Sequence, residues 1–297
     1  MQSILALSGK VESRLLRLSF TEQWVIGIRR TPDLHLPTRL MISSLLLPPA
    51  GTHFADPFII SRDGKTHVYF EAWRNADSTG SIWLTVLDAH GTWSQPEQVL
   101  KRPYHMSYPF IFSWRGELYM LPETQHNHTI ELYRCVTFPS TWELASVLME
   151  GVDAVDSTLF EDSGRWWMFA TGFGDTSTRL RRLSIFVASS PFGPWRAHRQ
   201  NPVLDNLGSA RSAGRLFWHN GRLIRPGQDC RLRYGHSIAW NRIDILSCSE
   251  YRETCIGRLK PLLWDGWTAA HTFNQVGGWQ VFDGKRLARK ASTSRNV

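Results

Sequence analysis

Four carboxylates stand at matching positions of a pattern that recurs along the chain. Asp56 and Asp156 each lie eight residues before the glycine of a turn, and Glu71 and Glu123 each lie seven residues after one. Grouped carboxylates suit general acid–base chemistry at an acetal carbon, because one activates an attacking hydroxyl while another protonates the leaving oxygen. We therefore expect these four residues to be catalytic. The alternative is that Asp56 and Asp156 only bond backbone amides at the start of a strand.

The recurring pattern is an apolar strand, a turn that ends in glycine, and a second strand rich in aromatic residues. It occurs five times, with turn glycines at Gly64, Gly116, Gly164, Gly221 and Gly278. The spacings of 52, 48, 57 and 57 residues between them are typical of propeller blades built from short strands. The sequence therefore predicts an all-β fold, a five-bladed β-propeller.

The fifth repeat lacks the outer strand pair that follows each of the other four. Residues 23–29 and 40–45 have the pattern of the missing third and fourth strands. We therefore expect the last blade to be completed by the N-terminal segment, which leaves no open sheet edge at the seam. The expected boundaries are a peripheral segment at 1–20, the propeller domain at 21–288 and a disordered basic tail at 289–297.

Equivalent positions of a propeller converge on its axis, because the first strand of each blade is innermost. The position of Asp56 recurs as Tyr108, Asp156, Ala213 and Ala270, and that of Glu71 recurs as Glu123, Thr171, Gln228 and Lys285. Further polar residues lie beside these two columns. The residues that we expect to bind substrate are His53, Tyr108, Arg211, Arg225, Gln228, Asp229 and His271.

Three of these side chains have alternative roles. Arg211 and Arg225 could clamp a phosphate or carboxylate of a ligand, or could pair with the protein's own carboxylates. His271 could be a core histidine, a ligand of an axial ion or water, or a proton donor. An oxygen-rich axial pocket could hold Ca²⁺, but the sequence contains no calcium-binding loop, so we expect no metal or other cofactor.

Composition narrows the class of partner. The net charge of +8 and the pI of about 9.6 favour anionic ligands such as sugar phosphates or phospholipid headgroups. We expect no nucleic-acid partner, because the sequence contains no nucleic-acid-binding motif. The 14 Trp and 15 Phe residues suit stacking on sugar rings as well as core packing.

Cysteine usage and the termini bear on location. The four cysteines form no CxxC pair, which favours free thiols in a reducing, cytoplasmic compartment. Residues 1–19 carry Arg14 and Arg17 within an apolar pattern, which makes a poor signal peptide and no membrane span but could form a short amphipathic helix. Together with the basic tail, this segment could hold the protein at an anionic membrane surface.

The sequences ADPFI at 55–59 and VDSTLFEDSG at 155–164 resemble the five-bladed propellers of glycoside hydrolase family 43. That resemblance implies that Asp56 is the general base and that Asp156 tunes the pKa of the general acid and orients it. It also implies that His271 approaches an axial calcium or water. The general acid of that family is a glutamate at the start of the fourth blade. Residues 209–214 contain no glutamate here, so Glu123 or Glu71 would have to replace it.

Five further segments carry a second resemblance, which covers about residues 23–286. They are ADPF at 55–58, YPFIF at 108–112, GELYMLPE at 116–123, SARSAGRLF at 209–217, and RPGQDC at 225–230 with YG at 234–235. They are similar to the N-terminal domain of plant glucosamine inositolphosphorylceramide transferases and its bacterial relatives. In the plant proteins this domain accompanies a separate glycosyltransferase domain, and the whole protein adds a sugar to a phosphosphingolipid.

Two hypotheses about function follow. The carboxylates in register favour an enzyme that hydrolyses or transfers a glycosyl group on a glycan, glycolipid or sugar-phosphate substrate in an axial pocket. The absent fourth-blade glutamate and the plant domain arrangement favour a non-catalytic module, which would bind a glycan or glycolipid headgroup for a glycosyltransferase partner.

Overall fold

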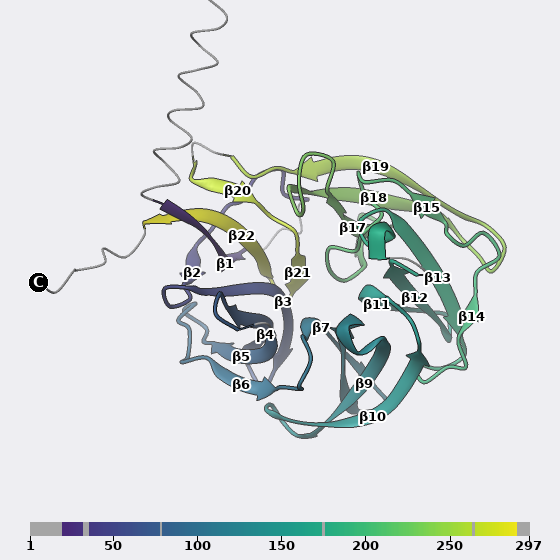
Figure 1. The fold of residues 1–297 in the computed structure, drawn as a ribbon, viewed down its shortest axis with the longest axis horizontal. Helices are drawn as coiled ribbons and strands as arrows, with labels where there is room; N and C mark the ends of the chain where they lie inside the picture. The colour runs from purple at the N-terminus through teal and green to yellow at the C-terminus, as the bar shows by residue number, and fades with distance from the viewer. Residues whose placement is uncertain (1–19, 32–35, 78, 174–175, 263–264, 290–297) are drawn as a thin grey trace, which may run out of the picture.

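Five antiparallel sheets surround a central axis in the computed structural model (Figure 1). The structure describes residues 20–31, 36–77, 79–173, 176–262 and 265–289. Within these ranges the helical elements are two single 3₁₀ turns, η1 (Gln125–Asn127) and η2 (Thr176–Thr178). The predicted all-β five-bladed propeller is therefore confirmed. The expected amphipathic helix at 1–19 and nearly all of the predicted tail lie outside the described residues.

The first four blades follow one another along the chain, and their strands are given from the axis outward. Blade 1 contains β3 (Thr52–Arg62), β4 (Lys65–Arg74), β5 (Ser81–Leu87) and β6 (Glu97–Leu100). Blade 2 contains β7 (Ser107–Trp114), β8 (Glu117–Thr124), β9 (Thr129–Thr137) and β10 (Thr141–Glu150). Blade 3 contains β11 (Val155–Asp162), β12 (Arg165–Thr171), β13 (Arg182–Ala188), β14 (Arg196–Ala197) and β15 (Leu204–Asp205). Blade 4 contains β16 (Phe217–His219), β17 (Arg222–Asp229), β18 (Ser237–Leu246) and β19 (Tyr251–Leu259).

Blade 5 joins the two ends of the chain, as predicted. Its inner strands β20 (Trp267–Ala269) and β21 (Phe273–Val276) both pair with β22 (Trp279–Arg289). The N-terminal β1 (Phe20–Arg30) then pairs with β22 along its whole length, and β2 (Ser44–Leu46) is outermost. This pairing closes the ring and covers an edge that would otherwise be free to pair with another chain.

The predicted strand at 40–45 is shorter than expected and begins only at Ser44. The residues before it cross to blade 4, where Arg39 forms a β-bridge with Lys260. There the carbonyl of Pro37 also accepts a hydrogen bond of 2.9 Å from the indole N–H of Trp240. These contacts hold residues 37–39 against blade 4, so the strand of blade 5 starts only after the chain has crossed back.

The five inner hairpins share one turn geometry. Each turn has two residues with positive φ, and these are Asp63-Gly64, Arg115-Gly116, Ser163-Gly164, Asn220-Gly221 and Gly277-Gly278. A two-residue type I′ turn needs positive φ at both positions, and its backbone twist matches that of the flanking strands. Glycine adopts this conformation without steric cost, which explains why it recurs at the last position.

Aromatic side chains fill the spaces between neighbouring blades. The ring of Phe58 packs 4.8 Å from Tyr108 and 5.6 Å from Phe110 between blades 1 and 2, measured between ring centroids. Trp240 and Phe273 join blades 4 and 5 at 5.0 Å. Each fully buried ring of this kind contributes roughly 1.5–3 kcal/mol, so the packing fixes the blades around the axis. Among the described residues, no helix has the length and apolar character needed to cross a bilayer.

Candidate active site

The first strands of blades 1, 2 and 3 share a β-bulge near the axis. In each strand the register slips by one residue, at Asp56, Tyr108 and Asp156. These residues have φ values of 51, 45 and 51°, in the left-handed region. A bulge redirects side chains and is common next to active sites, and Asp tolerates this backbone better than Tyr does. The repeated bulge therefore turns three equivalent side chains toward the centre of the ring.

Asp156 is held by two donors that come from blade 4. The Nε of Arg211 donates to Asp156 Oδ2 over 2.6 Å, and its Nη2 donates to Oδ1 over 3.3 Å. Gln228 Nε2 also donates to Oδ2, over 3.1 Å. Asp156 is only 2% exposed, and a bidentate ion pair of this kind offsets part of the cost of burying its charge.

Glu123 lies beside this ion pair and has a raised pKa. Its Oε2 accepts a hydrogen bond of 3.3 Å from the backbone N–H of Asp156 and lies 3.7 Å from Arg211 Nη2. Burial raises the pKa of Glu123 to about 8, and the negative charge of Asp156 adds to the rise while Arg211 opposes it. A protonated carboxyl at pH 7 is what a general acid requires.

Asp56 lies in blade 1 and titrates near neutral pH. Its Oδ1 accepts a hydrogen bond of 2.6 Å from the Thr272 hydroxyl and lies 3.9 Å from His271 Nε2. Burial raises the pKa of Asp56 to about 7, although His271 opposes the rise. Asp156 and Asp283 add to it. A carboxylate with a pKa close to the working pH is suited to accept a proton.

His271 is a charged histidine rather than a neutral core residue. Its Nδ1 lies 2.6 Å from Asp283 Oδ2, and its ring stacks on Trp24 with centroids 4.2 Å apart. Burial alone would lower the pKa of His271, but Asp283 and Asp56 raise it to about 9. The resulting imidazolium supports the negative charge of Asp56 when that residue is ionised.

In the described part of the chain, one group of side chains could hold a metal ion. It consists of Asp56, His271 and Asp283, whose potential ligand atoms lie within 4.8 Å of one another. The Asp283 carboxylate is already fully used. It accepts hydrogen bonds from the backbone amides of Asp56, His271 and Thr272, and it pairs with the His271 ring. A cation coordinated by Asp283 would have to displace these donors, so the donor set does not fit a directly bound metal.

Glu71 has a different environment from Glu123. Its Oε1 lies 3.0 Å from the Nε2 of His105, and the Nδ1 of that ring accepts a hydrogen bond from the Gly80 amide. Burial would lower the pKa of His105, but the hydrogen bond and charge of Glu71 outweigh it and raise that pKa. Glu71 thus accepts a hydrogen bond from a histidine whose other ring nitrogen is itself an acceptor, which suits it less than Glu123 to donate a proton.

Two of the expected substrate-binding residues are engaged in ion pairs inside blade 4. Arg225 donates from Nε and Nη2 to the Glu253 carboxylate, each over 2.7 Å, and its side chain is 1% exposed. Asp229 pairs with Arg231 over 2.7 Å and with Arg258 over 3.0 Å. We therefore assign Arg225 and Asp229 no contact with substrate.

His53 and Tyr108 also have their polar atoms occupied by the protein. The Nδ1 of His53 accepts a hydrogen bond from the Trp24 amide, and its Nε2 pairs with Asn75 over 2.8 Å. Burial lowers the pKa of His53, so it is neutral. The Tyr108 hydroxyl accepts a hydrogen bond of 2.8 Å from the Gly214 amide within the core. His53 and Tyr108 therefore help to hold the site in place and offer no free polar atom to a ligand.

Asp283 and Tyr234 were not predicted as site residues, and neither was Thr272, which donates to Asp56. Asp283 stands at the position equivalent to Tyr69, Leu121 and Phe169, all of which are core residues. A carboxylate at a position that is apolar in the other blades could have indicated a functional residue. Tyr234 lies on the β17–β18 loop, with its ring centroid 5.0 Å from the Arg211 guanidinium. Loops do not follow the strand period, so counting from the turns could not find it.

Comparison with known proteins decides the family. Residues 46–260 match the model for glucosamine inositolphosphorylceramide transferase 1, N-terminal. The chain belongs to this family. It is 35% identical over 257 residues to glucosamine inositolphosphorylceramide transferase 1 of Oryza sativa subsp. japonica, covering 82% of this chain and 34% of the relative. The Arabidopsis thaliana relative is 37% identical over 205 residues, covering 67% of this chain and 26% of the relative. The chain thus spans about a third or less of the length of these relatives.

Solved structures confirm the fold of this family member. A family 117 glycoside hydrolase from Zobellia galactanivorans has a TM-score of 0.54 at 12% identity, covering 80% of this chain and 76% of the hydrolase. The Cellvibrio cellulosa α-L-arabinanase, solved with arabinohexaose, has a TM-score of 0.52 at 13% identity, covering 68% and 77%. A family 43 protein from Bacillus licheniformis has a TM-score of 0.52 at 13% identity, covering 69% and 43%. At these identities the likeness extends to the propeller fold alone.

Proposed function

We propose that the propeller breaks a glycosidic bond at its axis and passes the glycosyl group to water or to an acceptor hydroxyl. The observation that carries this proposal is a pair of buried carboxyl groups near the axis, each bonded by different partners. Burial raises the pKa of both, of Glu123 to about 8 and of Asp56 to about 7, so both can gain or release a proton near neutral pH. Buried carboxyl groups with raised pKa values are typical of acid–base pairs.

The chemistry assigns one step to each group. Glu123 donates its proton to the glycosidic oxygen as the bond to the anomeric carbon breaks, and Asp56 takes the proton of the water or hydroxyl that forms the new bond. The negative charge of Asp156 beside Glu123 adds to the raised pKa of Glu123, although Arg211 opposes the rise. Glu123 gives up one proton and Asp56 takes up one, so the summed charge of the two carboxyl groups is the same before and after the reaction.

The substrate would approach the site from the side of Arg211 and His105, which is the more exposed one. The side chains of Arg211 and His105 are 12% and 24% exposed, whereas that of Asp156 is 2% exposed. Arg211 favours an anion at this side, because its guanidinium is cationic. The named activity of the plant relatives concerns an inositol phosphate. We therefore include in the proposal a sugar acceptor or leaving group that carries a phosphate.

The test compares leaving groups of different acidity. A panel of 4-nitrophenyl glycosides is assayed for nitrophenolate release, and the matching methyl glycosides are assayed for free sugar, with and without myo-inositol 1-phosphate as acceptor. Asp56→Asn should abolish turnover of both substrate types. Glu123→Gln should abolish turnover of the methyl glycosides and spare the nitrophenyl ones, because nitrophenolate leaves without protonation. Glu117→Gln, an exposed change in the same strand β8, is the matched control.

A result of no turnover with any of these substrates, or unchanged turnover in both variants, would contradict the catalytic proposal. The second candidate, a non-catalytic module that binds a glycan or glycolipid headgroup, then remains. It is supported by the absence of a glutamate from residues 209–214 and by the match of residues 46–260 to the N-terminal part of its relatives. It expects myo-inositol 1-phosphate or a sugar phosphate to bind without turnover, and Arg211→Ala to abolish that binding.

A further inference from the structure

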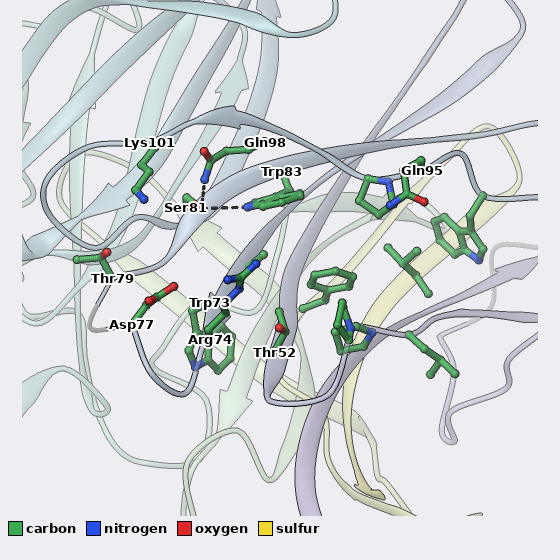
Figure 2. Close-up of a pocket in the computed structure, with 18 of the residues that line it drawn as sticks. Thr52, Trp73, Arg74, Asp77, Thr79, Ser81, Trp83, Gln95, Gln98 and Lys101 are labelled. Carbon is green, nitrogen blue, oxygen red and sulfur yellow. Dashed lines mark hydrogen bonds between the residues drawn. The ribbon is translucent and has the colours of Figure 1, made fainter. Parts of the chain in front are cut away.

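A groove lies on the side of blade 1, away from the axial carboxylates. It has a volume of about 830 Å³ and runs between the β2–β3 segment and strands β4 to β6 (Figure 2). Pockets that bind small molecules typically have volumes of roughly 300–1,000 Å³. The residues that line the groove do not include Asp56, Asp156, Glu123 or Arg211. The groove is therefore a separate feature of the molecule.

Three half-buried tryptophans line the groove, and two of them have their polar atoms already bonded. The indole N–H of Trp83 donates to the Ser81 hydroxyl over 3.0 Å, and that of Trp93 donates to the Ser44 hydroxyl over 2.9 Å. These bonds fix both rings in place. What the rings offer to a ligand is therefore their apolar surface rather than a hydrogen-bond donor.

Polar side chains complement these rings with groups that both donate and accept. Figure 2 shows Gln98, Ser81 and Trp83 along one side of the groove and Trp73 and Arg74 along the other. Gln98 uses one amide hydrogen to reach the Ser81 hydroxyl over 2.8 Å. Its carbonyl and second hydrogen have no further partner among the described residues. An amide of this kind can serve a hydroxyl group, which also donates and accepts.

We propose that this groove binds an unbranched, neutral chain of β-1,4-linked pyranose units. Such a chain is a flat ribbon with apolar ring faces and hydroxyl edges. It matches a groove with Trp83 and the Gln98 amide on one side and, on the other, Trp73, whose second face stacks on His53. The charges at one end of the groove are mixed, with Arg74 and Lys101 opposed by Asp77, so they do not select an anion. The class of ligand follows from two features of the groove: the apolar faces of its tryptophan rings, and an amide that can both donate and accept hydrogen bonds.

A proline-rich peptide fits the same groove less well. Proline has no N–H, so it could not donate to the acceptors Asp77 and Gln98. Groups that lose water without gaining a partner weaken binding when they are covered. A sugar hydroxyl has no such limitation. The hydrogen-bonding groups of the groove therefore favour a glycan over a polyproline segment.

The groove adjoins the axial cluster through one short segment. Thr79 and Ser81 line the groove, whereas Gly80 between them supports the axial side by donating to His105 Nδ1 over 2.8 Å. A Cβ at Gly80 would lie 2.6 Å from Glu71 Oε1. A glycan in the groove would thus lie next to the segment that contacts Glu71 and His105. This placement is independent of whether the axial site is catalytic.

The test is titration calorimetry of the whole protein with cellohexaose, xylohexaose and mannohexaose at millimolar concentration. We expect at least one of the three to bind. Trp83→Ala and Gln98→Ala should each weaken that binding by about tenfold, which corresponds to about 1.4 kcal/mol. Trp83→Phe keeps a ring and should restore most of it. Trp218→Ala, which removes a tryptophan that is 58% exposed on blade 4, is the control and should change nothing.

Three results would overturn the proposal. They are no binding of any of the three hexasaccharides, binding that is insensitive to both Trp83→Ala and Gln98→Ala, and binding of a proline decapeptide in their place. Asp56→Asn separates the groove from the axial site. Loss of hexasaccharide binding in that variant would place the glycan at the axis instead, whereas unchanged binding alongside lost turnover supports two distinct sites.

Discussion

The proton on Glu123 governs what the axial carboxyl groups can do. Glu123 must be protonated to act as an acid, and burial next to Asp156 raises its pKa to about 8. Asp56 must be ionised to act as a base, and burial raises its pKa to about 7. We therefore expect kcat/KM to rise as the pH increases through about 7 and to fall as it increases beyond about 8, which gives a narrow bell.

This profile is measured with a methyl glycoside, whose leaving group needs protonation. With a nitrophenyl glycoside the fall above about pH 8 should be weak, because nitrophenolate leaves without the proton of Glu123. A profile that is the same for both leaving groups would remove Glu123 from the acid role. His271→Gln provides a further check, since loss of the imidazolium should shift the rising limb, which belongs to Asp56, to higher pH.

At the scale of a strand, the bulge at Tyr108 ties three blades together. The Tyr108 hydroxyl on β7 pairs with the Thr158 hydroxyl on β11 over 2.9 Å and accepts from the Gly214 amide before β16. Tyr108→Phe should destabilise the protein by about 1–3 kcal/mol, because the buried Gly214 N–H loses its partner. Tyr119→Phe is the control, since that hydroxyl bonds the exposed Glu117. Urea unfolding of both variants measures the difference, and equal stabilities would contradict this role.

The seam between β1 and β22 is equally specific. A Cβ on Gly27 of β1 would lie 2.6 Å from the Phe282 ring of β22. Gly27→Ala should therefore force the ring or the strand to move, at a cost of about 1–3 kcal/mol. Gly257→Ala on β19 is the matched control, because its Cβ would meet Trp240 at an ordinary 3.5 Å. Thermal unfolding compares the two, and a Gly27→Ala variant as stable as the control would show that the seam tolerates repacking.

At the scale of the whole molecule, the propeller was predictable because local chemistry repeats with the blades. A type I′ turn requires positive φ at its last residue, so glycine marks every inner hairpin, and counting from it placed Asp56 and Asp156 on one axis. The pairing between β1 and β22 followed from the incomplete fifth repeat. These predictions depended on periodicity and sheet closure, which are properties of the sequence pattern.

The partners of the site residues were not predictable in the same way. Arg225 was a candidate ligand-binding residue, yet it pairs with Glu253, which lies 28 positions along the chain on another strand. Arg211 bonds Asp156 across 55 positions. Such ion pairs depend on where two side chains meet in space, and the sequence pattern fixes only the strands that carry them. The Asp283 cluster with His271 was missed for the same reason.

The summed protonation of the axis should make folding depend on pH. Burial is the main cause that raises the pKa of Asp56 from an ordinary 3.8 to about 7 and of Glu123 from 4.5 to about 8. For His271, Asp283 and Asp56 overcome burial and raise the pKa from 6.5 to about 9. All three therefore hold more protons in the folded state than in the unfolded state. Their contribution to stability is complete below the ordinary values and is lost as the pH rises through the folded ones.

Between pH 7 and 9 the loss of folding free energy comes mainly from Glu123 and His271. Each proton released costs up to about 1.4 kcal/mol of stability per pH unit. The free energy of unfolding in urea should therefore decrease across this window. Glu123→Gln removes one titrating group and keeps a side chain of similar shape, so its decrease should be shallower. Asp162→Asn, an exposed change at the end of β11, should leave the slope unchanged. A free energy that stays level or increases from pH 7 to 9 would mean that these groups are not protonated as the axial geometry requires.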